Sequence, residues 1–566
     1  MARQAHVGLC AVAVVIAAAN MSAVVLAESP ESPPKVPLPP LPGLRRVIVL
    51  ARHGNRAPNP QLHTLCPNLA KTVFPSFGVA PAALSRVGMA ENWEAGRFLR
   101  HRYRDFLPQG SYVYDGTFSF LSERTGRNIV ATSSLASGMF PLGTGIEGFK
   151  PERPNIVPIA TTQGGVDVLL NTAGDGPCRE ALAKDCEVWD VANEAQFYDK
   201  HRELFGVVSE ACGGSLEPGT FWWEGQRQDL AWALQAVMDG FTFSANEGLD
   251  ATIGGRLAES TIRDFHDVVE GMLSEQLFGQ RHQITYWSGD FVPTFLGLAH
   301  APLTDPMNKL HVFLTHRELQ YAVTHMLGMD ISFPGVRRDT LPSGSSVVAE
   351  VYDDGVRLYM WAPTRPSREA KARYLEEKRP LTELFSHGTL IPVEATGCPA
   401  AQLCPVDRLA LTFVQWVSET GTYVKVCNVS MEDKYVAQGD SSFNTVERWV
   451  PPEEVKALAR QRNLTFSVKE PAGVTESGSS ASDPNPRAAL RASLALQHST
   501  REDEADIIAK ADEASDRDMQ QAWHTGAIFV GALALPLAVV VAGWRLKRRA
   551  RERQEANDSA RYVILC

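Results

Sequence analysis

The sequence predicts an α/β protein with a mixed central sheet, flanking helices, an α-helical cap and one C-terminal transmembrane helix. Two short apolar runs, "RRVIVLAR" at 45–52 and "KLHVFLTH" at 309–316, predict buried strands. The first ends in a turn signal, and the second leads into a helical pattern that continues through Met326. A third feature, "VVAEVYDDG" followed by "VRLYMWAP", predicts a hairpin that turns at Asp353-Asp354-Gly355.

Helical spacing explains much of the remaining globular part. Residues 85–104 have the pattern of an amphipathic helix, with Met89, Trp93 and Phe98 on its apolar side. From about 150 to 290 the pattern is helical and irregular, which predicts the cap. Both segments belong to a domain that we expect to span residues 44–469.

The two ends of the chain predict a type I membrane protein. Residues 1–27 have the charged start, apolar middle and small-residue cleavage site of a signal peptide, with an uncleaved anchor as the alternative. A proline-rich lead (28–43) follows. Thr525–Trp544 carries no charge and would rise about 30 Å as a helix, enough to cross a bilayer. The basic run from Arg545 marks 545–566 as a cytoplasmic tail and 470–524 as a luminal acidic stalk.

Charge and cysteine content are consistent with this placement. The net charge of −10 gives no support for nucleic-acid binding. In an oxidising lumen cysteines form disulfides by default, and we predict Cys398 with Cys404 and Cys178 with Cys186. No cysteine pattern indicates a zinc site. Sequons predict glycosylation at two asparagines, Asn428 and Asn463.

The stretch "RHGNRAP" at 52–58 carries the strongest chemical signal. His53 follows a predicted buried strand, where α/β sheets place ligand-binding groups. Arg52 and Arg56 flank it, and each offers a fork of donors suited to phosphate oxygens. Two nearby cations also lower the pKa of a histidine, which keeps it neutral and nucleophilic. This arrangement therefore predicts a site for a small anion.

The stretch is similar to the RHGxRxP signature of the histidine phosphatase superfamily, in the branch of acid phosphatases and phytases. Three further segments follow in the family's order. They are "LSRVGMAENWEAGRFLRHRY" at 84–103, "SERTGRNIVATSSLASGMFP" at 122–141 and "HVFLTHRELQYAVTHMLG" at 311–328. The similarity runs from about Leu44 to Asn428. In overall organisation the chain resembles the type I membrane-bound and lysosomal acid phosphatases.

This resemblance implies a two-step phosphoryl transfer. His53 would attack phosphorus to form a phosphohistidine, which water would then hydrolyse. Arg52, Arg56 and Arg127 would bind the phosphate oxygens, and His316 would add a hydrogen bond or a positive charge. The resemblance implies no metal and no cofactor, and it assigns no role to Asn55.

One position departs from the family pattern. The residue after the second histidine is usually an aspartate that protonates the leaving alkoxide, whereas here it is Arg317, which cannot give up a proton. Glu318 is the next acid, and His316-Arg317-Glu318 resembles the His-Ala-Glu motif of inositol-polyphosphate phosphatases. We therefore expect Glu318 to be the general acid. Two alternatives stay open: a phytase-like phosphatase, and a catalytically impaired receptor that sorts or binds.

The tail carries "YVIL" at 562–565, a tyrosine-based pattern formed by Tyr562 and Leu565 that resembles the sorting signal of type I lysosomal acid phosphatases. It predicts a sorting adaptor as partner and an endosomal or lysosomal membrane as destination, with the cell surface as the alternative. The other expected partner is a small phosphomonoester substrate. A homodimer is one open alternative for the oligomeric state.

Overall fold

A computed structural model describes residues 42–107, 117–141, 156–223, 226–301, 309–331, 341–364, 388–429 and 452–462, with single residues 373, 377 and 464. All of them fall in the first of the two units into which the chain divides, and only that unit is described below. The predicted signal peptide, stalk, transmembrane segment and tail (Tyr562 and Leu565 included) lie outside these residues, as does Asn463. Within the described ranges, none of the helices combines the length and apolar character needed to cross a bilayer.

The described residues form a mixed seven-stranded sheet with the order β3-β2-β6-β1-β7-β8-β9. Four strands run parallel: β1 (Arg46–Arg52), β2 (Phe118–Ser122), β3 (Ala160–Thr161) and β6 (Leu310–Thr315). The antiparallel strands are β7 (Ser346–Tyr352), β8 (Gly355–Ala362) and β9 (Thr389–Pro392). Both predicted buried strands and the predicted hairpin are confirmed.

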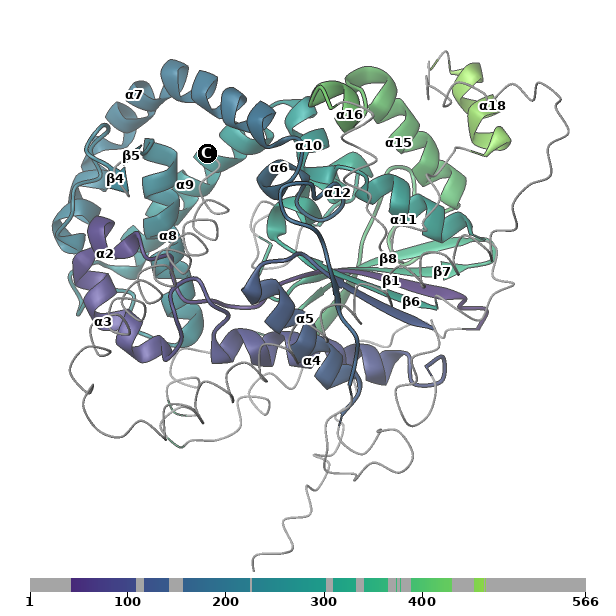
Figure 1. Cartoon of the computed structure of the whole chain (residues 1–566), viewed down its shortest axis with the longest axis horizontal. Coiled ribbons are helices and arrows are strands. Elements are labelled where there is room, and N and C mark those ends of the chain that lie inside the picture. Colours follow the sequence, from purple (N-terminus) through teal and green to yellow (C-terminus); the bar gives the residue numbers. More distant parts are fainter. Residues whose placement is uncertain are drawn as a thin grey trace, which may run out of the picture. The chain divides into compact units, whose positions relative to one another are not determined.

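Helices cover both faces of this sheet (Figure 1). Because side chains alternate along a strand, Val47 and Val49 of β1 enter one core and Ile48 and Leu50 enter the other. The first core includes α4 (Arg86–Arg102) and α5 (Gly126–Met139), and the second includes α11 (Phe291–His300) and α12 (Arg317–Met326). The prediction of an α/β protein with a mixed sheet and flanking helices is confirmed.

Helix α4 forms where the sequence predicts a helix, and its buried face includes small and polar residues that the prediction did not name. Met89, Trp93 and Phe98 are only partly buried, whereas the small and polar residues beside them are buried. The reason is close packing, since a side chain at Gly96 would meet the Leu135 carbonyl of α5. Helix α4 therefore presents small residues to its neighbours.

A helical lobe lies beside the sheet (Figure 1) and consists of α2 (Leu62–Leu65), α3 (Pro67–Phe77), α7 (Arg179–Cys212), α8 (Leu230–Glu247) and α9 (Glu259–Phe278). The other described elements are α6 (Thr172–Asp175), α10 (Arg281–Ser288), α15 (Val406–Thr420), α16 (Tyr423–Val426), α18 (Glu453–Gln461) and the small hairpin β4 (Trp222–Trp223) and β5 (Gln226–Arg227). The lobe supplies three acidic side chains to the site described below.

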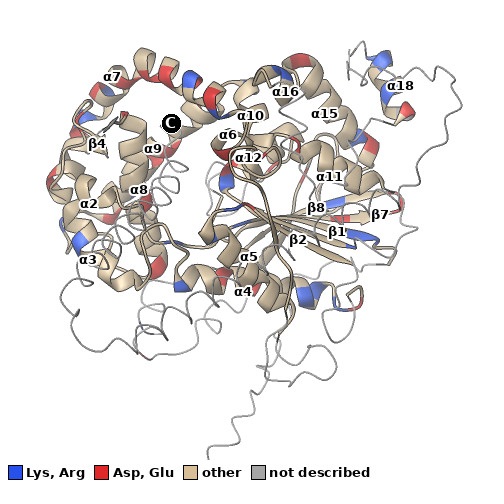
Figure 2. Ribbon diagram, in the orientation of Figure 1, with Lys and Arg blue, Asp and Glu red and all other residues tan. Residues whose placement is uncertain are grey.

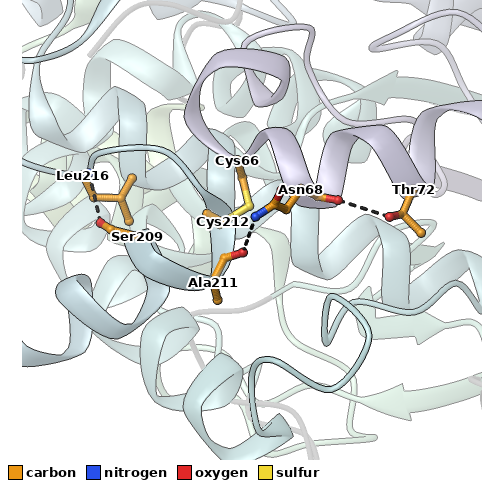
Figure 3. Close-up of a disulfide and its surroundings, with 7 residues drawn as sticks. All are labelled: Cys66, Asn68, Thr72, Ser209, Ala211, Cys212 and Leu216. Carbon is orange, nitrogen blue, oxygen red and sulfur yellow. Dashed lines mark hydrogen bonds between the residues drawn. A yellow bond between two sulfur atoms is a disulfide. The ribbon is translucent and has the colours of Figure 1, made fainter.

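Three disulfides link parts of the described chain. The predicted Cys398–Cys404 bond is present, and a Cys66–Cys212 bond joins the start of α3 to the end of α7 (Figure 3). The predicted Cys178–Cys186 bond is wrong, because Cys178 bonds to Cys427. Cys178 caps α7 and Cys186 lies within it. Eight residues of helix rise by about 12 Å, too far for one disulfide to span.

Candidate active site

The site lies at the edge of the sheet where its parallel strands end. His53 directly follows β1, Glu123 follows β2 and His316 follows β6. The His53 N–H donates to the Thr315 carbonyl at 3.1 Å, and the Glu123 N–H donates to the Leu314 carbonyl at 2.9 Å. The backbone hydrogen bonds between the strands thus continue one residue past the strand ends, and they fix the backbone positions of His53 and Glu123. Ligand-binding groups of open α/β sheets occur at this edge.

His53 is buried, with 4% of its surface exposed, and its neighbours favour the neutral ring. Its Nδ1 lies 2.8 Å from the Gly54 carbonyl oxygen. Since a carbonyl can only accept, Nδ1 carries the hydrogen and Nε2 keeps its lone pair. Burial lowers the pKa of His53 well below the usual histidine value, and His316, Arg127, Arg52 and Arg56 lower it further. The imidazole is therefore a neutral nucleophile at acidic as well as neutral pH.

Helix α4 shapes the loop that carries His53. The Gly54 N–H donates to Asn92 Oδ1 at 2.6 Å, and the Asn55 N–H donates to Glu91 Oε2 at 2.7 Å. A Cβ atom at Gly88 would lie 1.9 Å from the Asn55 carbonyl oxygen, so only glycine allows this approach. Our sequence reading missed Glu91 and Asn92. The signal available in the sequence was the pair of polar residues, Glu91 and Asn92, one turn after Gly88 in the predicted helix.

Asn55 connects the same loop to the helical lobe. Its side chain is fully buried and donates to Glu247 Oε2 at 2.8 Å and to the Phe243 carbonyl at 3.1 Å, both on α8. The sequence analysis gave Asn55 no role. In the structure its side chain connects the loop that carries His53 to α8, so Asn55 positions the loop.

Arg52 and Arg56 both lie in the site, with different partners. Arg52 donates from Nη1 to the Leu341 carbonyl. Arg56 donates from Nη2 to Asp239 Oδ2 of α8 at 2.8 Å and from Nη1 to Asn59 Oδ1 at 2.7 Å. Burial lowers the pKa of Arg56 to about 10 although Asp239 opposes the shift, so the guanidinium stays charged. Asp239 thus neutralises one of the two cations that flank His53.

Arg127 lies in the first turn of α5. Its Nε atom is buried and has no hydrogen-bond partner in the described part of the chain. Burial lowers its pKa, while the charges of Glu123 and Glu318 oppose that shift. A buried guanidinium whose donor is unsatisfied is suited to bind an anion.

His316 stands opposite His53, with the ring centroids 5.3 Å apart at 78°. Its Nε2 lies 3.5 Å from Glu123 Oε2 and 3.1 Å from Asn128 Nδ2. Burial alone would raise the pKa of Glu123, but the hydrogen bond and charge of His316 and the hydrogen bond from Thr125 hold it well below its ordinary value. An ionised Glu123 therefore helps to orient the His316 ring.

Glu318 follows in the first turn of α12, where its carboxylate accepts from Arg317 Nε at 3.1 Å. Arg317 also donates from Nη1 to Glu270 of α9. Burial would raise the pKa of Glu318, but Arg317, His316 and Arg52 outweigh burial and lower it. The side chain of Glu318 keeps 17% of its surface exposed, so it can reach a bound molecule.

The structure brings together all six residues singled out for catalysis and phosphate binding. Besides Glu91, Asn92 and Glu247, four further partners were missed, namely Glu123, Asn128, Asp239 and Glu270. Asp239 and Glu270 lie within long helices of the lobe, and Figure 2 shows acidic positions on both α8 and α9. No local pattern marks these two, whereas Glu123 could have been noticed as a carboxylate at a strand end.

Three other histidines near the motifs make packing or side-chain contacts. His63 stacks on Phe74, His311 contacts Ser119 Oγ and His325 packs on Tyr321. Trp222 of the small hairpin is 59% exposed. The described residues contain no group of three or more His, Cys, Asp or Glu arranged to hold a metal ion.

Comparison with known proteins gives two partial sequence matches. The chain is 30% identical over 171 residues to the lysosomal acid phosphatase of Xenopus laevis, covering 29% of this chain and 33% of the relative. It is 32% identical over 143 residues to that of Bos taurus, covering 24% and 30%. The matches thus span about a third of these relatives. They confirm that the chain resembles the acid phosphatase branch of the histidine phosphatases, and no family model matches.

Solved structures of phytases were also found. A Hafnia alvei phytase in complex with tartrate is 17% identical, covering 68% of this chain and 98% of that chain at a TM-score of 0.48. A phytase of Klebsiella sp. ASR1 is 16% identical, covering 67% and 96% at a TM-score of 0.47.

Proposed function

We propose that this protein is an acid phosphatase that hydrolyses phosphomonoesters through a phosphohistidine on His53. The observation that carries the proposal is His53 itself, a buried and neutral imidazole with a free Nε2 lone pair among arginines. The partial similarity to lysosomal acid phosphatases supports the same reaction.

The proposed first step forms a bond between His53 Nε2 and phosphorus while the ester P–O bond breaks. Arg52, Arg127 and the partly neutralised Arg56 stabilise the charge on the phosphoryl oxygens. The departing alkoxide takes a proton from Glu318. In the second step water attacks the phosphohistidine, Glu318 accepts a proton from that water, and inorganic phosphate leaves.

Glu318 must hold a proton for the first step although its pKa is lowered in the free protein. A bound phosphomonoester brings negative charge close to the carboxylate and opposes Arg317, so it raises the pKa of Glu318. Acidic surroundings increase the protonated fraction further. We therefore expect an acidic pH optimum for alkyl phosphates.

Replacing His53 with alanine tests the reaction. The His53→Ala variant should lose about 10⁴-fold or more in kcat, because the covalent route disappears. The first measurement is release of inorganic phosphate from an aryl phosphate near pH 5. The second is trapping of an acid-labile phosphoryl label from labelled substrate, which should appear on the wild-type protein and not on the variant. Equal activity of wild type and variant would remove the proposal, and so would an inert wild type that carries no label.

Glu318→Gln tests the acid. The variant should lose about 10²–10⁴-fold on alkyl phosphates, whose alkoxides need a proton, and far less on aryl phosphates. His311→Gln serves as a control, because that histidine contacts Ser119 outside the site. An equal loss on both substrate classes would assign Glu318 a structural role.

We further propose that residues 44–469 form the luminal catalytic domain and that Thr525–Trp544 anchors it to endosomal or lysosomal membranes. The names of the two relatives support that destination. Alkaline washing should leave the full chain in the membrane pellet, and Tyr562→Ala should shift it to the cell surface. A protein released by the wash would contradict the anchor.

Asn428 is exposed, which supports glycosylation there.

A further inference from the structure

A narrow groove lies beside the site, between α9 and α12. Residues of α9 and of the first turns of α12 form most of its lining, and Leu341 completes it. The lining residues are Glu270, Leu273, Ser274, Leu277, Phe278, Arg317, Glu318, Tyr321 and Leu341.

Most of the groove surface is apolar. Leu273, Leu277 and Leu341 are buried, and the rings of Phe278 and Tyr321 lie 4.4 Å apart at 50°. The two hydroxyl groups on the wall, Ser274 Oγ and Tyr321 OH, face each other at 3.4 Å. A ligand therefore meets mainly carbon atoms here.

The charges in the groove do not favour a second anionic group. Arg317 is the one cation among the described lining residues, and two carboxylates, Glu270 and Glu318, share it. With one positive and two negative groups, the described lining is net negative. An inositol polyphosphate carries several phosphates and would need uncompensated cations in this space.

The groove adjoins the phosphate-binding arginines. The Leu341 carbonyl accepts a hydrogen bond from Arg52 Nη1, so a lining residue of the groove is in direct contact with an arginine of the site. Glu318 lines the groove, and its charge acts on Arg56 and Arg127. A phosphoryl group held by the arginines would thus present its ester oxygen to Glu318 and its carbon skeleton to the groove.

We propose that this groove binds the leaving alcohol and selects phosphomonoesters whose alcohol is apolar and carries no second phosphate. The inference rests on the proposed function and specifies its substrate class. The reaction converts an apolar alkyl or aryl phosphate and water into the alcohol and inorganic phosphate. Burial of the alcohol against Leu273 and Leu277 supplies the selectivity.

A series of primary alkyl phosphates tests the groove without changing the chemistry of the leaving group. With the full chain, kcat/KM should rise roughly threefold for each methylene between ethyl and hexyl phosphate, as each one leaves water. Inositol hexakisphosphate should be cleaved more slowly than hexyl phosphate. Equal rates for ethyl and hexyl phosphate, or a preference for inositol hexakisphosphate, would overturn the inference.

Two neighbouring residues of α9 give a matched pair of variants. Leu273→Ser should lower the ratio of kcat/KM for hexyl over ethyl phosphate at least about fivefold, because Leu273 lines the groove. Met272→Ser removes an equally buried side chain that is not part of the lining, and should leave this ratio unchanged. Since the readout is a ratio between two substrates, partial unfolding of either variant does not affect it.

The outcomes separate the two proposals. If ethyl and hexyl phosphate are cleaved equally well by wild type but not by His53→Ala, the groove inference fails and the proposed function stands. If neither ester nor any aryl phosphate is cleaved, the proposed function fails and the groove inference with it. If both variants change the ratio alike, the groove lining does not determine selectivity.

Discussion

At His53, charge compensation determines which cations remain for a phosphate. Asp239 pairs with Arg56, and Glu270 and Glu318 share Arg317. Arg127 differs, because its buried Nε has no hydrogen-bond partner among the described residues. If a bound phosphate is the first partner of this N–H, the new hydrogen bond stabilises the complex without breaking one within the protein. We therefore expect Arg127 to take part directly in phosphate recognition.

Arg317 controls the proton on Glu318. Its guanidinium lowers the pKa of that carboxyl, so Arg317→Met should raise the pKa and keep Glu318 protonated to higher pH. The falling limb of the kcat profile for ethyl phosphate should then move to higher pH. The profile for an aryl phosphate should stay in place, since its leaving group needs no proton. Steady-state rates across the acidic range provide the measurement.

The matched control for this change is Arg202→Met. Arg202 is an exposed residue of α7 paired with Asp199, so its loss removes one positive charge that contacts no catalytic carboxylate among the described residues. Both pH profiles should be unchanged in that variant. A shift of the ethyl phosphate profile to lower pH in Arg317→Met would contradict the role given to Arg317.

Motif residues were predictable from the sequence because the chain carries them in fixed local patterns. His53, Arg52 and Arg56 lie within five residues, and His316 and Glu318 lie within three. Their compensating acids could not be predicted in this way. Asp239 and Glu270 meet the arginines only through the packing of α8 and α9, and a helix position that faces a site looks locally like one that faces solvent.

At the scale of elements, a similar limit applies to the buried face of α4. Apolar residues mark only part of that face, because Gly96 packs on α5, and Glu91 and Asn92 accept hydrogen bonds from the catalytic loop. Apolar periodicity identifies a helix reliably. It does not identify the buried face where a helix packs against backbone.

Gly88→Ala tests the contact between α4 and the catalytic loop. A Cβ atom there would lie 1.9 Å from the Asn55 carbonyl oxygen, so helix and loop must separate. We expect a loss of about 1–3 kcal/mol in stability and of about 10²-fold in kcat/KM, because His53 is displaced. Chemical denaturation and initial rates with an aryl phosphate measure the two effects.

Gly206→Ala is the control for that substitution. Gly206 lies in α7, and a Cβ atom there meets nothing within 4 Å. Alanine should leave kcat/KM unchanged and raise stability by about 0.5–1 kcal/mol, as expected for glycine replaced within a helix. Equal activity of the Gly88→Ala variant and wild type would show that α4 does not position the loop.

At the scale of the whole described unit, disulfides connect parts that are far apart in sequence. The Cys178–Cys427 bond spans 249 residues and links the start of α7 to the end of α16. Sequence spacing favoured the nearby Cys186 instead. Spacing reveals short loops such as Cys398–Cys404, whereas a long-range pairing depends on the tertiary structure that brings its ends together.

Loop length predicts how much each bond contributes. In the chain-entropy model, closing the 249-residue separation stabilises the fold by about 5.5 kcal/mol, and closing the 6-residue separation of Cys398–Cys404 by about 2 kcal/mol. The double variant Cys178→Ser/Cys427→Ser should therefore unfold at lower denaturant concentration than Cys398→Ser/Cys404→Ser. Equilibrium unfolding under oxidising conditions gives the comparison.

The same two variants show whether the long bond acts on the unfolded chain or on the site. If it mainly restricts the unfolded chain, the initial rate with an aryl phosphate, measured well below the melting temperature, stays close to wild type in both variants. A lower rate in the Cys178→Ser/Cys427→Ser variant alone would mean that the bond also holds the lobe in position. In that case Asp239 and Glu270, which the lobe contributes, would be displaced from Arg56 and Arg317.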